Sequence, residues 1–81
     1  MTRVSGLLDK DGYLLRLGRS VRAKRIALEL SQEALADLAG VDRSHMGKIE
    51  RGERNVTFLN ILRISEAMGC KPSELLADAG L

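Results

Sequence analysis

Several residue types that stabilise small secreted proteins or membrane proteins are scarce in this sequence. It contains one cysteine, Cys70, so an internal disulfide cannot form and a reducing compartment is expected. Aromatic residues make up only 2% of the chain, which leaves aliphatic side chains to build the core. No apolar run approaches the length of a membrane span, and the N-terminus lacks the apolar core of a signal peptide. We therefore expect a soluble, cytoplasmic protein.

Groups that carry catalysis or hold metal ions are scarce as well. His45 is the only histidine, and no cysteine or carboxylate cluster stands near it at ligand spacing. The sequence contains no phosphate-binding loop and no nucleophile elbow. A chain of 81 residues is also scarcely large enough to enclose a substrate pocket. We expect no enzyme activity, no metal, no cofactor and no small-molecule ligand.

The charged residues are unevenly distributed along the chain. Five cations and no acid lie between Gly12 and Leu28, and a second basic group extends from Arg43 to Arg54. Acids outnumber cations after Asn55. This asymmetry suits a polyanionic partner such as nucleic acid, although a basic solvated face would produce the same pattern.

Apolar periodicity divides the chain into a flexible arm, residues 1–12, and one domain, residues 13–81. A composition rich in leucine and alanine with a single proline favours helices, so we predict an all-α fold. The expected helices cover about residues 13–29, 32–39, 43–51, 58–68 and 72–79. The expected N-terminal caps are Asp11, Ser31, Asp42 and Thr57.

Residues 31–51 are the most informative part of the sequence. A slim helix, a turn of only two residues at Gly40 and Val41, and a second helix are typical of a DNA-reading helix-turn-helix. The periodicity of the second helix turns Met46, Ile49 and Glu50 inward. Its outer face then carries Arg43, Ser44, Gly47 and Lys48. Arginine and lysine are the usual donors to guanine, and Gly47 is expected to leave a gap for close approach.

These segments resemble the phage Cro/repressor-type (XRE) helix-turn-helix family. The resemblance rests on residues 31–36 (SQEALA), 40–44 (GVDRS) and 49–52 (IERG), and continues through residues 60–69 and 72–76, covering about residues 15–77. It implies a compact five-helix, lambda-repressor-like domain whose second and third helices form the helix-turn-helix. Within the family the chain is similar to small restriction-modification controller proteins, which are autonomous dimers, although His45 stands where controllers often carry tyrosine and Gly52 where some carry asparagine.

The resemblance also implies roles for individual residues. Arg43, Ser44 and Lys48 are expected to contact bases. Contacts to the DNA backbone or flank are expected from Gln32, His45, Arg51, Arg54 and Asn55. The family often pairs an arginine of the first helix with a glutamate at the end of the third, here Arg25 and Glu50. The apolar stripes of the two helices independently turn these two charges inward.

Four leucines near the C-terminus are candidates for a dimer interface: Leu59, Leu62, Leu75 and Leu76. The alternative is that the fifth helix simply packs back onto the fourth. The leading interpretation is a sequence-specific regulator that binds double-stranded DNA as a homodimer on a partly palindromic operator, as a controller or repressor. An antitoxin or coactivator-like protein-interaction module with the same fold is the alternative, and the acidic, leucine-bearing C-terminus supports it.

Overall fold

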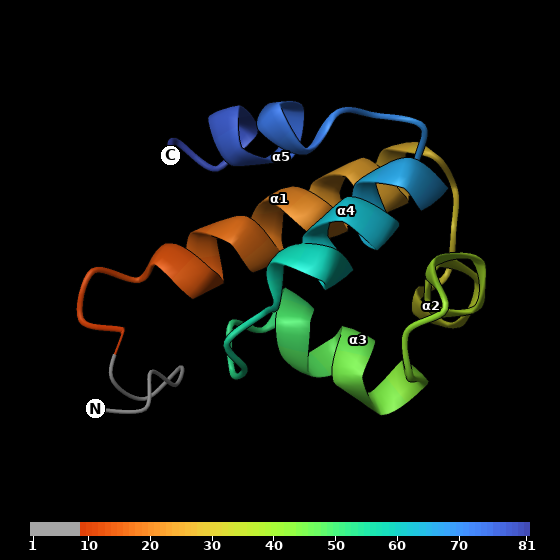
Figure 1. The fold of residues 1–81 in the computed structure, drawn as a ribbon, viewed down its shortest axis with the longest axis horizontal. Coiled ribbons are helices and arrows are strands. Elements are labelled where there is room, and N and C mark those ends of the chain that lie inside the picture. Colours follow the sequence, from red (N-terminus) through yellow and green to blue (C-terminus); the bar gives the residue numbers. More distant parts are fainter. Residues whose placement is uncertain (1–8) are drawn as a thin grey trace.

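The computed structural model describes residues 9–81, and this part of the chain forms five α-helices (Figure 1). Their bounds are α1 Tyr13–Ala27, α2 Gln32–Ala39, α3 Arg43–Glu50, α4 Phe58–Ala67 and α5 Pro72–Asp78. The prediction of five helices in an all-α domain is confirmed. Differences from the expected bounds are limited to one or two residues at helix ends, where chains commonly fray or tighten.

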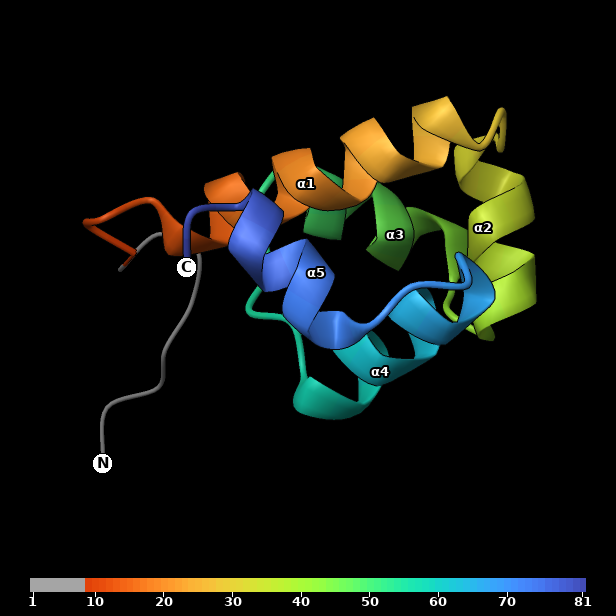
Figure 2. The same cartoon turned by 90° about the horizontal axis from the view of Figure 1, so that it is seen from above.

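The helices pack so that α3 lies at one face of the molecule. α1 contacts α3 and α5, α2 contacts α3 and α4, and α4 contacts α5. Figure 1 shows α3 and α5 on opposite faces with α1 and α4 between them, and Figure 2 shows the same molecule from above, with α5 in front. The third helix is therefore presented on the face away from the C-terminus.

The core is aliphatic, as the composition predicts. Its largest fully buried apolar side chains come from four different helices: Leu35, Met46, Ile64 and Leu75. The burial of Leu75, at 1% exposure, shows that its assignment to a dimer interface was wrong. Its side chain fills the space between α5 and the body of the same subunit, which is the alternative that the sequence left open.

Three of the helices are capped at their N-termini by the side chains of the predicted residues. The hydroxyl of Ser31 accepts a hydrogen bond from the backbone N–H of Ala34 at 3.0 Å, and that of Thr57 accepts one from Asn60 at 3.1 Å. The carboxylate of Asp42 accepts from the first turn of α3. These bonds satisfy N–H groups that have no partner within a helix.

The cap of α1 differs from the prediction. The carboxylate of Asp9, rather than that of Asp11, accepts hydrogen bonds from the backbone N–H groups of Tyr13 at 3.0 Å and Leu14 at 2.7 Å. Asp11 is exposed and was wrongly predicted as the cap. A turn closed by the bond from Gly12 N–H to the carbonyl of Asp9 brings the earlier carboxylate back to the helix. Residues 1–8 of the expected arm lie outside the described residues.

α1 and α3 cross at Gly18, where the two backbones are in close contact. A Cβ atom added to Gly18 would lie 2.5 Å from the carbonyl oxygen of Glu50 and closer still to that of Ile49. Only a residue without a side chain fits between these backbones. Gly18 thus determines how closely the end of α3 packs against α1.

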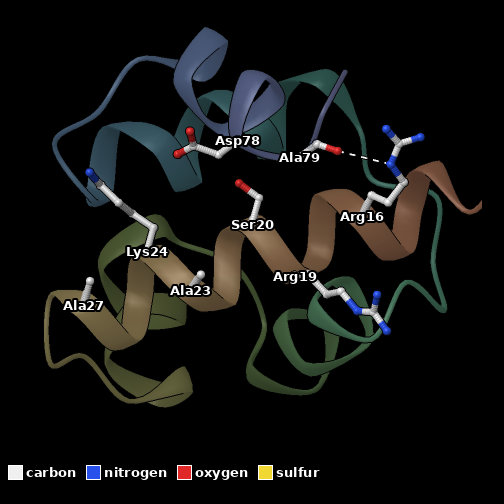
Figure 3. Close-up of a pocket in the computed structure, with 8 residues that line it drawn as sticks. All are labelled: Arg16, Arg19, Ser20, Ala23, Lys24, Ala27, Asp78 and Ala79. Carbon is white, nitrogen blue, oxygen red and sulfur yellow. Dashed lines mark hydrogen bonds between the residues drawn. The ribbon is translucent and has the colours of Figure 1, made fainter.

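Polar side chains of α1 bind the end of α5. Ser20, which is buried, donates its hydroxyl to the carbonyl of Leu75 at 2.8 Å. The guanidinium of Arg16 donates to the carbonyls of Ala79 at 3.2 Å and Gly80 at 2.8 Å, and Figure 3 shows the first of these bonds. The C-terminal helix is therefore held to the domain by hydrogen bonds as well as by the burial of Leu75.

Candidate nucleic-acid interface

The turn between α2 and α3 has the short form that the sequence predicts. Gly40 adopts a left-handed conformation, with φ at 69°, which a residue with a side chain rarely adopts. Val41 follows it, is buried, and donates its N–H to the carbonyl of Ala36 at 2.9 Å. α3 starts only two residues later, so the turn sets it across α2 at the molecular surface.

The two faces of α3 are divided as predicted. Met46, Ile49 and Glu50 are buried. Arg43 and Ser44 are exposed, while His45 and Lys48 are half-buried. None of these four side chains is fully buried, so a basic edge of α3 remains accessible.

The expected gap at Gly47 is absent. Gly47 is buried, because the side chains of Gln32 and Arg51 lie over it. An added Cβ atom would meet a terminal nitrogen of Arg51 at 3.0 Å and the amide oxygen of Gln32 at 3.5 Å. The prediction that Gly47 leaves open space on the outer face was therefore wrong: two long polar side chains fill that space.

The predicted ion pair between Arg25 and Glu50 is present and lies at the C-terminal end of α3. The guanidinium of Arg25 donates to the two carboxylate oxygens of Glu50 at 2.7 and 2.9 Å. A third nitrogen donates to the carbonyl of Leu30 at 2.9 Å, and the amide of Gln32 donates to Glu50 at 3.0 Å. The hydrogen bond with Glu50 raises the pKa of Arg25 above its ordinary value. Among the described residues no buried side-chain nitrogen or oxygen lacks a hydrogen-bond partner, and this cluster joins α1, α2 and α3.

Arg43 contacts two acids that the sequence analysis did not assign to the site. One terminal nitrogen lies 3.5 Å from the carboxylate of Glu33, and the other lies 3.2 Å from that of Asp37. The hydrogen bond with Asp37 raises the pKa of Arg43. The spacing of Glu33 and Asp37, four residues apart on α2, puts them on one face and was a usable signal.

A polar hollow of about 390 Å³ lies beside the exposed edge of α3. Ser44, His45 and Lys48 of α3 line it together with Arg54 of the following loop and Asn60 of α4. The structure thereby brings together two predicted base-contacting residues and two predicted flank residues. Asn60 was missed, because only the tertiary structure brings α4 next to the start of α3.

The remaining predicted flank residues lie outside this hollow. Gln32 and Arg51 lie over Gly47, and Arg51 forms an ion pair with Glu53. Asn55 is exposed in the loop next to Arg54. Predicted flank residues thus lie in the hollow, over Gly47 and in the loop that follows α3.

Comparison with known proteins decides the family. The helix-turn-helix family matches residues 21–75, which include α2, α3 and the turn between them. The chain belongs to this family. The predicted resemblance to its XRE type is confirmed, and the chain is a DNA-binding transcription regulator rather than an enzyme.

Relatives of this helix-turn-helix protein include restriction-modification controllers. The control protein C.SmaI of Serratia marcescens is 38% identical over 65 residues, which are 80% of this chain and 77% of that protein. C.BamHI of Bacillus amyloliquefaciens is 43% identical over 63 residues, or 76% of this chain and 78% of that protein. The crystal structure of the controller protein C.AhdI from Aeromonas hydrophila superposes with a TM-score of 0.76 at 48% identity, covering 76% of this chain and 94% of that one.

The leucines considered for a dimer interface differ in exposure in this helix-turn-helix protein. Leu59 is 54% exposed, and Leu62 and Leu76 are half-buried. Phe58, beside Leu59 at the start of α4, is 73% exposed and was not predicted to belong to this surface. Three of the four leucines therefore remain available for contacts with another molecule, whereas Leu75 does not.

A second hollow, of about 470 Å³, lies between α1 and α5 (Figure 3). Two alanines of α1 and Ala79, which directly follows α5, line it, with Arg19 and Lys24 from α1 and Asp78 from α5. Among residues 9–81, no group of three or more histidine, cysteine or acidic side chains is arranged to hold a metal ion. Within the same residues, no helix combines the length and apolar character needed to cross a bilayer.

Proposed function

We propose that this regulator acts in the cytoplasm as a homodimer on a partly palindromic operator in double-stranded DNA, in the manner of a controller or repressor. Arg43, Ser44 and Lys48 contact base edges in the major groove. The observation that carries the proposal is the exposed basic edge of α3, which begins directly after the tight turn at Gly40. The controller proteins among its relatives support the regulatory assignment.

The chemistry of this edge suits base recognition. An arginine donates two hydrogen bonds to O6 and N7 of guanine, a lysine donates to the same atoms, and a serine hydroxyl reaches several base edges. α3 has eight residues and is about 12 Å long, so it spans only a few base pairs. One such helix reads too little sequence for a unique site, which is the physical reason for two subunits on two half-sites.

The flank residues provide phosphate contacts in this proposal. His45 and Arg54 lie beside Ser44 and Lys48 in the hollow, and Arg51 and Asn55 follow α3. Gln32 is the first residue of α2, where helix N–H groups have no intrahelical partner and attract phosphate. Its side-chain amide already donates to Glu50. Each cation that binds a phosphate makes DNA binding more sensitive to salt.

The dimer interface is proposed to include Leu59, Leu62 and Leu76, together with Phe58. Exposed apolar side chains of this size stabilise association when they are removed from water. Sedimentation of Leu59→Lys should show a monomer at concentrations where the wild type is dimeric. Leu38→Lys is the matched control, because Leu38 is 64% exposed on α2. A dimer unaffected by Leu59→Lys would contradict this interface.

Selection from random duplex DNA tests the proposed function. The wild type should enrich a sequence with two related half-sites, and Arg43→Ala should lose the preference at one position of each half-site. Lys48→Ala should weaken binding, whereas Lys71→Ala, at the start of α5 away from α3, should not. If the wild type enriches no sequence at low salt, the proposal is wrong.

A protein-interaction module of the antitoxin or coactivator type is the second candidate. The exposure of Phe58 and Leu59 favours it, because these side chains could bind a different protein as well as a second copy. Failure of the purified chain to form a complex with any duplex would favour this function.

A further inference from the structure

Arg43, the residue proposed to read a base, is held by acids of the neighbouring helix in the protein alone. Its two terminal nitrogens face the carboxylates of Glu33, at 3.5 Å, and Asp37, at 3.2 Å. The second contact is also a hydrogen bond. Both acids belong to α2, so the helix-turn-helix itself provides alternative acceptors for the guanidinium.

These carboxylates compete with DNA for the same donors. The terminal nitrogens of an arginine are the groups that donate to O6 and N7 of guanine. A guanidinium that turns toward a base edge leaves the carboxylates, and these then stand without their partner near the negatively charged backbone. We propose that Glu33 and Asp37 form a carboxylate clamp on Arg43 that lowers the affinity of the protein for its operator. This inference rests on the proposed role of Arg43 in base recognition.

The exposure of the three side chains makes such a clamp weak and reversible. The side chains of Arg43, Glu33 and Asp37 are 60%, 70% and 62% exposed. Exposed ion pairs change an equilibrium constant by a factor of about 1.5 to 5. A good bidentate contact favours the correct base over a wrong one by a factor of about 5 to 150. DNA of the correct sequence can therefore displace the clamp. Because this displacement reduces the net gain on binding, the clamp raises the protein concentration needed to fill the operator.

Asp37→Asn and Glu33→Gln test the clamp, since they remove charge but keep size. Each variant should bind the selected operator about 2- to 5-fold more tightly per subunit, or about 4- to 25-fold when two subunits bind together. The gain should shrink as salt rises, because exposed ion pairs are screened. Asp78→Asn, an equal change of charge on α5, is the matched control and should have little effect. Thermal unfolding verifies that each variant is folded.

The same substitutions in an Arg43→Ala background separate the clamp from simple repulsion between the acids and DNA. If the carboxylates act through Arg43, Asp37→Asn gains nothing further once Arg43 is absent. An equal gain in both backgrounds would overturn the clamp, and so would weaker binding by Asp37→Asn alone. The proposed function is tested by a different result: it is wrong if the wild type selects no DNA sequence. In that case the clamp, which rests on it, is wrong as well.

Discussion

Replacement of Gly18 by alanine tests the α1–α3 crossing that positions the DNA-facing helix. The added methyl group would lie 2.5 Å from the carbonyl oxygen of Glu50, whereas ordinary contacts begin at 3.4 Å. The obstacle is backbone, which cannot rotate away, so the two helices must separate by about 1 Å. Even the methyl group of alanine, the smallest side chain, therefore displaces α3 when it is added at position 18.

The expected cost follows from two opposing effects. Overpacking of a tight contact lowers the free energy of unfolding by about 1–3 kcal/mol. The loss at Gly18 should lie at the upper end of this range, because the added methyl group meets backbone atoms. Alanine gains about 1 kcal/mol over glycine in helix propensity. The net loss of about 1–2 kcal/mol lowers the Tm by about 4–16 °C in a domain of this size. Operator binding should weaken as well, because α3 moves relative to the rest of the domain.

Gly47→Ala is the matched control, because it makes the same substitution inside another helix. The new methyl group at position 47 would meet the ends of the Arg51 and Gln32 side chains, which can move aside. We expect Gly47→Ala to be as stable as the wild type or up to about 1 kcal/mol more stable. Thermal and urea unfolding, followed by circular dichroism, measure both variants. A Gly18→Ala protein with wild-type stability would refute the close packing inferred at this crossing.

Three further substitutions test other contacts. Glu50→Ala should cost about 3–5 kcal/mol in urea unfolding, because it leaves the charge of Arg25 without its partner; a cost below 1 kcal/mol would contradict the buried pair. The hydrogen bond that the hydroxyl of Ser44 donates to Asp42 lowers the pKa of this carboxyl below its ordinary value of 3.8. The stability that this carboxylate contributes is therefore present above pH 3.8 and is lost as the pH falls through the lower pKa of the folded state. The Tm of Asp42→Asn should therefore fall less than that of the wild type as the pH is lowered. Parallel curves of Tm against pH for the two proteins would argue against this. Ser20→Ala should cost about 1 kcal/mol, measured by the same unfolding assay, because the buried bond to Leu75 is lost, and an unchanged midpoint would exclude a contribution from it.

Local physical chemistry made much of the fold predictable. Ser31 and Thr57 cap helices because their hydroxyls bond N–H groups only three residues away, and Gly40 permits the left-handed turn. The ion pair of Arg25 and Glu50 was predictable for a related reason. Helical periodicity places each charge on a buried face, and a buried charge requires a partner.

Two of the failed predictions involve choices between similar local possibilities. Asp9 and Asp11 both precede α1 and both are short acids, and the turn between them selects the earlier one. Leu75 and Leu76 are adjacent and equally apolar, yet only Leu75 is fully buried. Which leucine faces inward depends on the angle at which α5 packs, and no nearest-neighbour pattern specifies that angle.

The amino-acid sequence by itself determined the helices, the caps of α2, α3 and α4, the tight turn and the basic composition of α3, since these depend on residues within about one helical turn of each other. Only the tertiary structure decided that Gln32 and Arg51 cover Gly47 and that Asn60 lines the hollow beside Lys48. Long polar side chains have many rotamers of similar energy, and partners brought close by the packing of different helices select among them.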